Sequence, residues 1–130
     1  MMQALLESGV SLVCDRYLYS GAAYSFANGL DLTWCLMCDD GLMKPDCVIY
    51  IDVLPEVASK RGEWGEERYE VLEFQEKVYD AYKVLSGCDD VEWVVVDGTK
   101  AKEQVAEIVL QECLRVLNST EDVNSLVNKV

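Results

Sequence analysis

Apolar residues form three short and nearly continuous runs along the chain. The runs are VSLVC, CVIYIDV and EWVVVD, at residues 10–14, 47–53 and 92–97. Strands that are buried on both faces of a parallel sheet have this continuous apolar character, whereas half-exposed strands alternate. We therefore predict three parallel strands.

The stretches around these runs have helical spacing. Between 66 and 86, for example, apolar residues recur at intervals that place them along one stripe of a helix. Pro55 suits the first position of a short helix, and Gly62 suits its end. Residues 1–9 resemble the end of a helix, and residues 118–130 are more polar and are expected to fray. The predicted full helices cover 20–38, 54–61, 66–86 and 101–117.

Alternating strands and helices predict a doubly wound α/β fold, with helices on both faces of a parallel sheet. Each apolar run ends in or beside an acid: Asp15, Asp52 or Asp97. Ligands bind beyond the carboxyl ends of strands in such folds, although aspartate is also a common turn residue and helix cap. Three strands make a small sheet, so the sequence resembles part of a fold.

Composition narrows the class of protein. The chain has 130 residues, enough for one domain, and a net charge of −13, which disfavours nucleic acid as a partner. No apolar run approaches the roughly 20 residues of a membrane span. The start, MMQALLESGV, lacks the basic region of a signal peptide. We expect a soluble intracellular protein.

Two of the six cysteines, Cys35 and Cys38, form a CxxC motif. A single CxxC is half of a zinc site, and the chain has no histidine to complete one. Without a secretory signal, disulfides are not expected. We interpret these cysteines as ordinary packing residues, with a structural metal or a redox role as the alternatives.

The segment most informative about chemistry is DRYLYSGAAYS, which follows the first apolar run. Arg16 can present a planar fork to a phosphate, and Asp15 can orient it or hold water on a magnesium ion. Ser20 and Gly21 fall where the next helix opens, and Tyr24 follows one turn later, beside Ser25. The alternative is a salt bridge plus a helix cap.

This segment resembles the DRY-x-x-S-G-x-A-[FY] signature of thymidylate kinases. Further along, GLMKPDCVIYIDV resembles the family's G-L-x-K-P-D segment, and RGEWGEERYE resembles its lid and the helix start that follows. Phe74-Gln75 matches an F-Q in that helix, and VVVDGTK resembles the last core strand and its turn. The resemblance covers about residues 3–117 in collinear order, so the chain is identified as a member of this family.

The resemblance implies roles on the acceptor side of a kinase site. Arg16 would contact the phosphate of dTMP, and Asp15 would lie near the magnesium–phosphate centre, giving an indirect Mg²⁺ contact. The nucleoside would lie against α-helical positions after the DRY motif and against the R-Y-E helix. These further substrate-binding residues are Ser20, Gly21, Tyr24, Ser25, Tyr69, Glu70 and Gln75.

The family resemblance also implies roles on the ATP, or donor, side of the kinase site. Arg61 resembles an adenine-side arginine, and the turn from Asp97 to Lys100 would border adenine. The lid, residues 62–68, would close over the phosphates. Its members implied at the site are Trp64, Gly65 and Arg68. The lid resembles the eukaryotic type, in which the P-loop supplies a catalytic arginine.

None of the eight glycines begins the Gly-Lys-Ser/Thr end of a P-loop, G-x-x-x-x-G-K-[ST]. We therefore expect the P-loop strand, its helix and the next strand–helix unit to be absent from these residues. In the family that strand lies between those at 10–14 and 47–53, so these two should separate or pair differently. The implied organisation is a kinase-like domain at 1–117 and a polar tail at 118–130.

The implied function is Mg²⁺-assisted transfer of the ATP γ-phosphoryl group to dTMP, for dTTP biosynthesis. The family resemblance implies a homodimer for the full-length protein, located in the cytoplasm, nucleus or mitochondrion. A second hypothesis is a catalytically silent fragment or isoform that keeps a nucleotide-contacting or dimerisation surface. A third, another P-loop kinase such as a deoxynucleoside kinase, is disfavoured by R-Y-E and S-G-x-A-Y.

Overall fold

The chain divides into two compact units. The computed structural model describes residues 1–61, 68–88 and 91–127, apart from the side chains of 68–70 and 120–127. The first unit contains residues 1–11, 45–52 and 91–130, and the second contains 12–44 and 53–90. No helix within the described ranges is both long and apolar enough to span a membrane.

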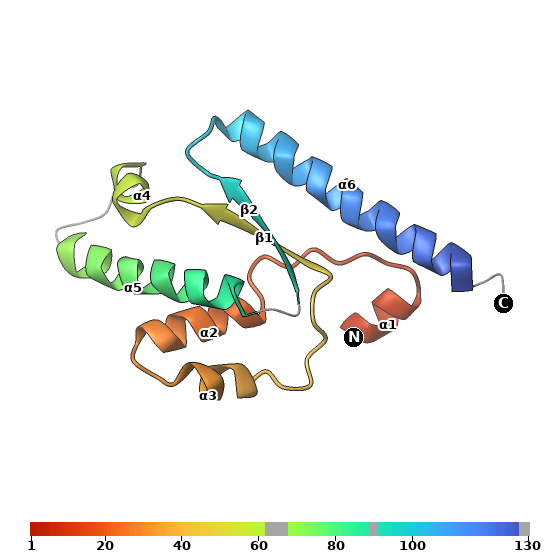
Figure 1. Cartoon of the computed structure of the whole chain (residues 1–130), viewed down its shortest axis with the longest axis horizontal. Helices are drawn as coiled ribbons and strands as arrows, with labels where there is room; N and C mark the ends of the chain where they lie inside the picture. The colour runs from red at the N-terminus through yellow and green to blue at the C-terminus, as the bar shows by residue number, and fades with distance from the viewer. Residues whose placement is uncertain (62–67, 89–90, 128–130) are drawn as a thin grey trace. The chain divides into compact units, whose positions relative to one another are not determined.

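The first unit contains a two-stranded parallel sheet. Its strands are β1 (Cys47–Asp52) and β2 (Glu92–Asp97), and they pair along their whole length. The long helix α6 (Lys102–Val127) follows β2 and contacts it (Figure 1). The short helix α1 (Met2–Glu7) also belongs to this unit. Parallel strands need a long crossover connection, which the second unit supplies here.

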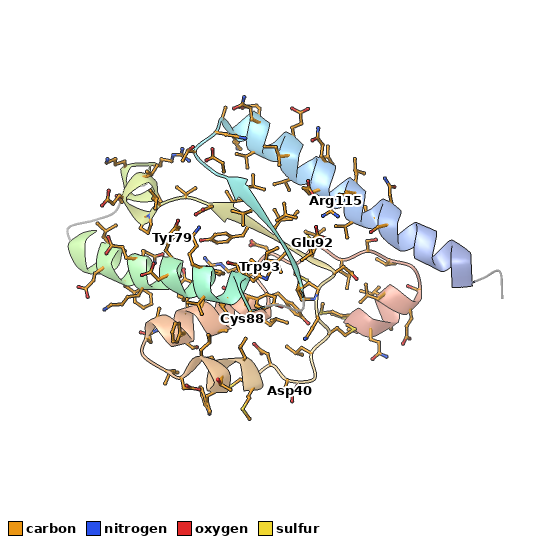
Figure 2. The ribbon with its side chains drawn as sticks, in the orientation of Figure 1. Asp40, Tyr79, Cys88, Glu92, Trp93 and Arg115 are labelled. Carbon is orange, nitrogen blue, oxygen red and sulfur yellow. The ribbon has the colours of Figure 1, made fainter. Side chains whose placement is uncertain are left out.

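An ion pair ties α6 to the sheet. The Nη2 atom of Arg115 lies 2.6 Å from a carboxylate oxygen of Glu92 on β2 (Figure 2), and its Nε lies 2.7 Å from Glu112. Successive side chains of a strand point to opposite faces, so Val96 shares the face of Glu92. Val96 is buried, which indicates that α6 covers this face of β2.

The second unit is helical. It contains α2 (Leu18–Ala27), α3 (Leu32–Met37), α4 (Pro55–Arg61) and α5 (Arg68–Ser86). Helix α2 packs against α3 and α5, and α5 also contacts α4. Small residues on α2 and an apolar stripe on α5 are buried, which lets helices approach closely. These buried residues are Ala22, Ala23, Val78, Ala81 and Leu85.

The prediction of one helix over residues 20–38 is wrong, because the chain turns between α2 and α3. Gly29 has a φ of 91°, a left-handed conformation that ends a helix and that glycine adopts without strain. Asp31 then caps α3, since its carboxylate accepts a hydrogen bond from the Trp34 amide at 2.9 Å. Two local signals therefore override the helical apolar pattern.

The prediction of a strand at residues 10–14 is also wrong. The segment has no strand structure, and Val13 is 93% exposed. A strand is stabilised by hydrogen bonds to a neighbouring strand, and the described sheet consists of β1 and β2 alone. Apolar character without a partner does not form a strand. Residues 10–14 accordingly form no ladder with β1 in the described sheet.

The remaining elements are confirmed at their predicted places, with one change of length. Helix α4 begins at Pro55, and α5 ends at Ser86 as predicted, while its predicted start at 66 lies outside the described residues. Helix α6 continues to Val127, beyond the predicted end at Leu117. No glycine or proline occurs after Gly98, so nothing in the backbone chemistry ends the helix earlier.

Substitution of Leu85 tests the described core of the helical unit. Leu85 is 1% exposed, whereas its neighbour Val84 is 45% exposed. Leu85→Ala should lower the free energy of unfolding by about 2–5 kcal/mol, because it leaves a cavity in a packed core. Val84→Ala should change it by less than about 1 kcal/mol. Urea denaturation followed by circular dichroism measures both, and equal effects would contradict the assigned packing.

Candidate functional site

A strained turn at Arg16 precedes helix α2. Arg16 has a φ of 62°, and it is the one non-glycine residue with positive φ in the described part of the chain. Such conformations are uncommon and persist where surrounding contacts hold them, often at functional sites. The next residue, Tyr17, is extended, and its hydroxyl donates to the carbonyl oxygen of Met43 at 3.1 Å. This bond ties the turn to the segment before β1.

The Arg16 side chain rests on an aromatic pair. Its guanidinium carbon lies 5.6 Å from the ring centroid of Tyr24, a cation–π distance. The Tyr24 ring in turn meets Phe74 of α5, with centroids 6.0 Å apart and an interplanar angle of 61°. This edge-to-face geometry is a favourable arrangement for two rings. The three side chains thus connect the turn, α2 and α5.

The alternative interpretation of the DRY segment, a salt bridge with a helix cap, is not supported. Within the described residues, neither Asp15 nor Arg16 forms an ion pair, and both are exposed. The N-cap position of α2 is Tyr17, which makes no side-chain capping bond. Arg16 is therefore available to a ligand from solvent.

Four predicted substrate-binding residues occupy one side of α2. Ser20, Gly21, Tyr24 and Ser25 stand at spacings of one and four residues, which place them on neighbouring rows of a helix surface. Gly21 is exposed, and the other three are half-buried. Since Tyr24 carries Arg16 over its ring, this side of α2 adjoins the strained turn.

The structure describes only some of the predicted site residues of α5 and of the lid. Gln75 is half-buried and follows Phe74 directly on α5. Tyr69 and Glu70 lie in the first turn of α5, but their side chains are outside the described residues. The side chain of Arg68 also lies outside the described residues, as do all atoms of Trp64 and Gly65.

The turn after β2 is held by its own hydrogen bonds. Asp97 Oδ1 accepts from the amide of Thr99 at 2.9 Å and from its hydroxyl at 2.6 Å. The Gly98 amide donates to the carbonyl oxygen of Asp52 at 2.9 Å, which joins the carboxyl ends of the two strands. Lys100 is exposed. Asp97 thus has a structural role as a turn residue.

The predicted donor-side residues do not fall in one unit. Asp97 and Lys100 belong to the first unit, whereas Arg61 ends helix α4 in the second. Arg61 is exposed, and as a cation in the last turn of α4 it complements the partial negative charge of that helix end. Neither unit by itself assembles the donor side.

Metal ligands are sparse in the described part of the chain. It holds no group of three or more cysteine, aspartate or glutamate side chains placed to bind a metal ion. Asp15 offers a single exposed carboxylate. This suits Mg²⁺, which keeps several waters and is often bound through one or two carboxylates together with substrate phosphates.

Of the two CxxC cysteines, only Cys35 is packed as the sequence predicts. Cys35 on α3 is buried, while Cys38 is exposed and its sulfur lies 3.4 Å from the Trp34 carbonyl oxygen. Burial raises the pKa of the Cys35 thiol, and the charges of Cys38 and Asp31 raise it further. All six cysteines are free thiols.

Sequence reasoning missed the structural partners of the site. It identified Phe74 as part of a motif and gave it no role, and it did not anticipate the bond from Tyr17 to Met43. The aromatic pair joins residues that are far apart in the chain. The F-Q motif was the available signal for Phe74, and Met43 carried none.

The chain is similar to thymidylate kinases. A sequence profile of the family described as "Thymidylate kinase" matches residues 1–109. Thymidylate kinases of Arabidopsis thaliana and Plasmodium falciparum (isolate 3D7) are 44% identical over 114 residues and 40% identical over 126 residues. These alignments cover 88% and 96% of this chain, and 42% and 59% of the relatives. The Homo sapiens thymidylate kinase is 39% identical over 108 residues, or 82% of this chain and 51% of its own length. The chain thus spans about half the length of the curated relatives it matches.

The different environments of the two CxxC cysteines should appear in their reactivity. A raised pKa leaves less thiolate at a given pH, and burial limits access, so both effects slow alkylation of Cys35. We expect iodoacetamide at pH 8 to modify Cys38 about tenfold faster or more. Fragment mass spectrometry over time distinguishes the two sites, with exposed Cys88 as a control. Equal rates at Cys35 and Cys38 would contradict the packing role.

Proposed function

The chain belongs to the thymidylate kinase family, and from this premise we propose that it carries the acceptor side of an enzyme that phosphorylates dTMP with ATP. The observation that carries the proposal is the strained turn at Arg16. It presents an exposed guanidinium that no described carboxylate neutralises. A dianionic monophosphate is the ligand that such a group binds well.

The dTMP phosphate would bind Arg16. A guanidinium is a planar fork whose N–H groups match two phosphate oxygens. The Tyr24 ring lies within cation–π distance of this fork, and no described hydrogen bond or ion pair occupies its N–H groups. Because phosphoryl transfer depends on positioning and charge stabilisation, an arginine at the acceptor phosphate would serve both.

The nucleoside would lie along α2 and the start of α5. The hydroxyls of Ser20 and Ser25 would face the thymine edge, Gly21 would allow close approach, and Tyr24 would border the nucleoside. On α5, three residues would approach the deoxyribose side. These are Tyr69, Glu70 and Gln75.

The donor side would use Arg61 near adenine, together with the turn from Asp97 to Lys100. The lid, with Trp64, Gly65 and Arg68 among its ATP-side residues, would close over the phosphates and exclude water. Mg²⁺ bound with ATP neutralises charge on the phosphates. Asp15, an exposed carboxylate beside Arg16, would hold water on that ion.

The broader assignment follows the same proposal. Residues 1–117 would form the kinase-like domain and 118–130 a polar tail. The active protein would be a homodimer in the cytoplasm, nucleus or mitochondrion, supplying dTDP for dTTP biosynthesis. The ATP phosphates would be bound by a P-loop outside these 130 residues, which contain no G-x-x-x-x-G-K-[ST] motif.

A chimera tests the proposed reaction. The P-loop-containing part of the Arabidopsis relative would be joined ahead of Met1, at the boundary that the alignment defines. We expect Mg²⁺- and ATP-dependent conversion of dTMP to dTDP, measured by chromatography of the nucleotides. The 130-residue chain alone should show no measurable conversion. An inactive but folded chimera would favour a catalytically silent fragment. Turnover by the chain alone would contradict the proposal that a P-loop outside these 130 residues binds the ATP phosphates.

Arg16→Ala in the same chimera tests the acceptor site. Loss of the guanidinium removes charge stabilisation of the phosphate, so kcat should fall by about 10²-fold or more. Arg16→Lys is the matched control: it keeps the charge but loses the bidentate fork, and it should restore part of the rate. Steady-state kinetics with varied dTMP measure both variants. An unchanged kcat for Arg16→Ala would show that Arg16 does not support the transferring group.

A further inference from the structure

The position of the Arg16 guanidinium depends on one described contact. Arg16 is exposed, and within the described residues it makes no hydrogen bond or ion pair. Its guanidinium carbon lies over the Tyr24 ring at 5.6 Å. A long flexible side chain on the surface samples many rotamers unless a partner holds it. The Tyr24 ring is that partner.

The Tyr24 ring is in turn oriented by Phe74. A cation binds the face of an aromatic ring, so the plane of the ring decides where the cation rests. Phe74 meets Tyr24 edge-to-face, with centroids 6.0 Å apart and planes at 61°. Rotation of Tyr24 would break this geometry. Phe74 therefore restrains the plane on which Arg16 lies.

Phe74 is anchored by the buried stripe of α5. It precedes Val78 by four residues, and Ala81 and Leu85 continue the same stripe. Val78 is 4% exposed and Ala81 is 0% exposed, and α5 packs on α2. This stripe fixes the helix that carries Phe74 relative to the helix that carries Tyr24.

We propose that Phe74 is a positioning residue for the acceptor phosphate, acting through Tyr24 on Arg16. By orienting the Tyr24 ring, it keeps the Arg16 guanidinium where a monophosphate can bind and leaves its charge available. This inference rests on the proposed function for the identity of the ligand. The control of Arg16 by Phe74 is a property of the chain without ligand.

The alternative is that Phe74 contributes packing alone. Tyr79 on the same helix (Figure 2) provides a matched control, because it is also half-buried. Its ring carries the Lys83 ammonium at 4.9 Å from the centroid. Phe74→Leu and Tyr79→Leu each replace one half-buried ring of α5 by an aliphatic side chain. The proposal requires that only the first of them affects Arg16.

The first experiment is nuclear magnetic resonance of the isotope-labelled chain without ligand. Because the guanidinium lies over the Tyr24 ring, we expect the ring current to shift the Arg16 Nε–H resonance, and Tyr24→Leu should show its position without the ring. Phe74→Leu should move this resonance toward that position. Phe74→Tyr, which keeps a ring, and Tyr79→Leu should leave it near the wild-type value. An unmoved resonance in Phe74→Leu, with a shift in Tyr24→Leu, would overturn the proposal.

The second experiment compares the affinity of the chain for dTMP and for thymidine, which lacks the phosphate. Phe74→Leu should lower the preference for dTMP by about two- to fivefold, the range expected for an exposed cation–π contact. In an Arg16→Gln background, Phe74→Leu should cause no further loss of the preference for dTMP over thymidine, because both changes act on one interaction. Equal losses for both compounds would overturn the positioning role and assign Phe74 to packing.

These measurements separate the inference from the proposed function. Failure of the chain to bind dTMP would overturn the proposed function, while a displaced Arg16 resonance in Phe74→Leu would still uphold control of Arg16. If Phe74→Leu does not fold, Phe74→Met keeps a flexible apolar side chain on α5 and carries the same expectations. Dispersed amide resonances establish that each variant is folded.

Discussion

Arg16 holds a left-handed backbone conformation that costs an ordinary residue roughly 1–2 kcal/mol, and the contacts around the turn offset this cost. The Tyr17 hydroxyl bonds to the Met43 carbonyl on one side, and the Tyr24 ring contacts the guanidinium on the other. The turn aims Arg16 back over the helix that the same turn opens. A residue with ordinary backbone angles would direct its side chain elsewhere, so the geometry of the candidate site follows from this conformation.

The sequence correctly predicted the elements that are stabilised by local interactions or by pairing with one another. The runs at 47–53 and 92–97 are strands because each is the hydrogen-bonding partner of the other. The equally apolar run at 10–14 has no such partner in the described sheet, and periodicity cannot reveal that. The break between α2 and α3 is different, since Asn28-Gly29 is a strong turn signal and Asp31 is a strong cap. That error lay in giving apolar spacing more weight than turn chemistry.

For the candidate site, the sequence predicted which residues share one side of a helix, but it did not predict which residues of different helices are in contact. The spacing of Ser20, Tyr24 and Ser25 placed them on one side of α2, because helical geometry is regular. Contact between Tyr24 and Phe74 depends on how α2 and α5 pack, which no local pattern specifies. The φ of Arg16 was equally inaccessible, since left-handed conformation is not expected of arginine.

The aromatic support of Arg16 also resolves a difficulty posed by the charge of the chain. A protein with a net charge of −13 repels phosphate at long range, so a binding site must act locally. Arg115 shows the usual result of abundant acids, because Glu92 and Glu112 both pair with it and offset its charge. A carboxylate could hold Arg16 in place equally well, but it would cancel the charge that attracts the ligand. An aromatic ring positions the guanidinium while leaving that charge in force. The contact between Arg16 and Tyr24 therefore both positions the guanidinium and preserves its positive charge, whereas an ion pair would position it and neutralise it.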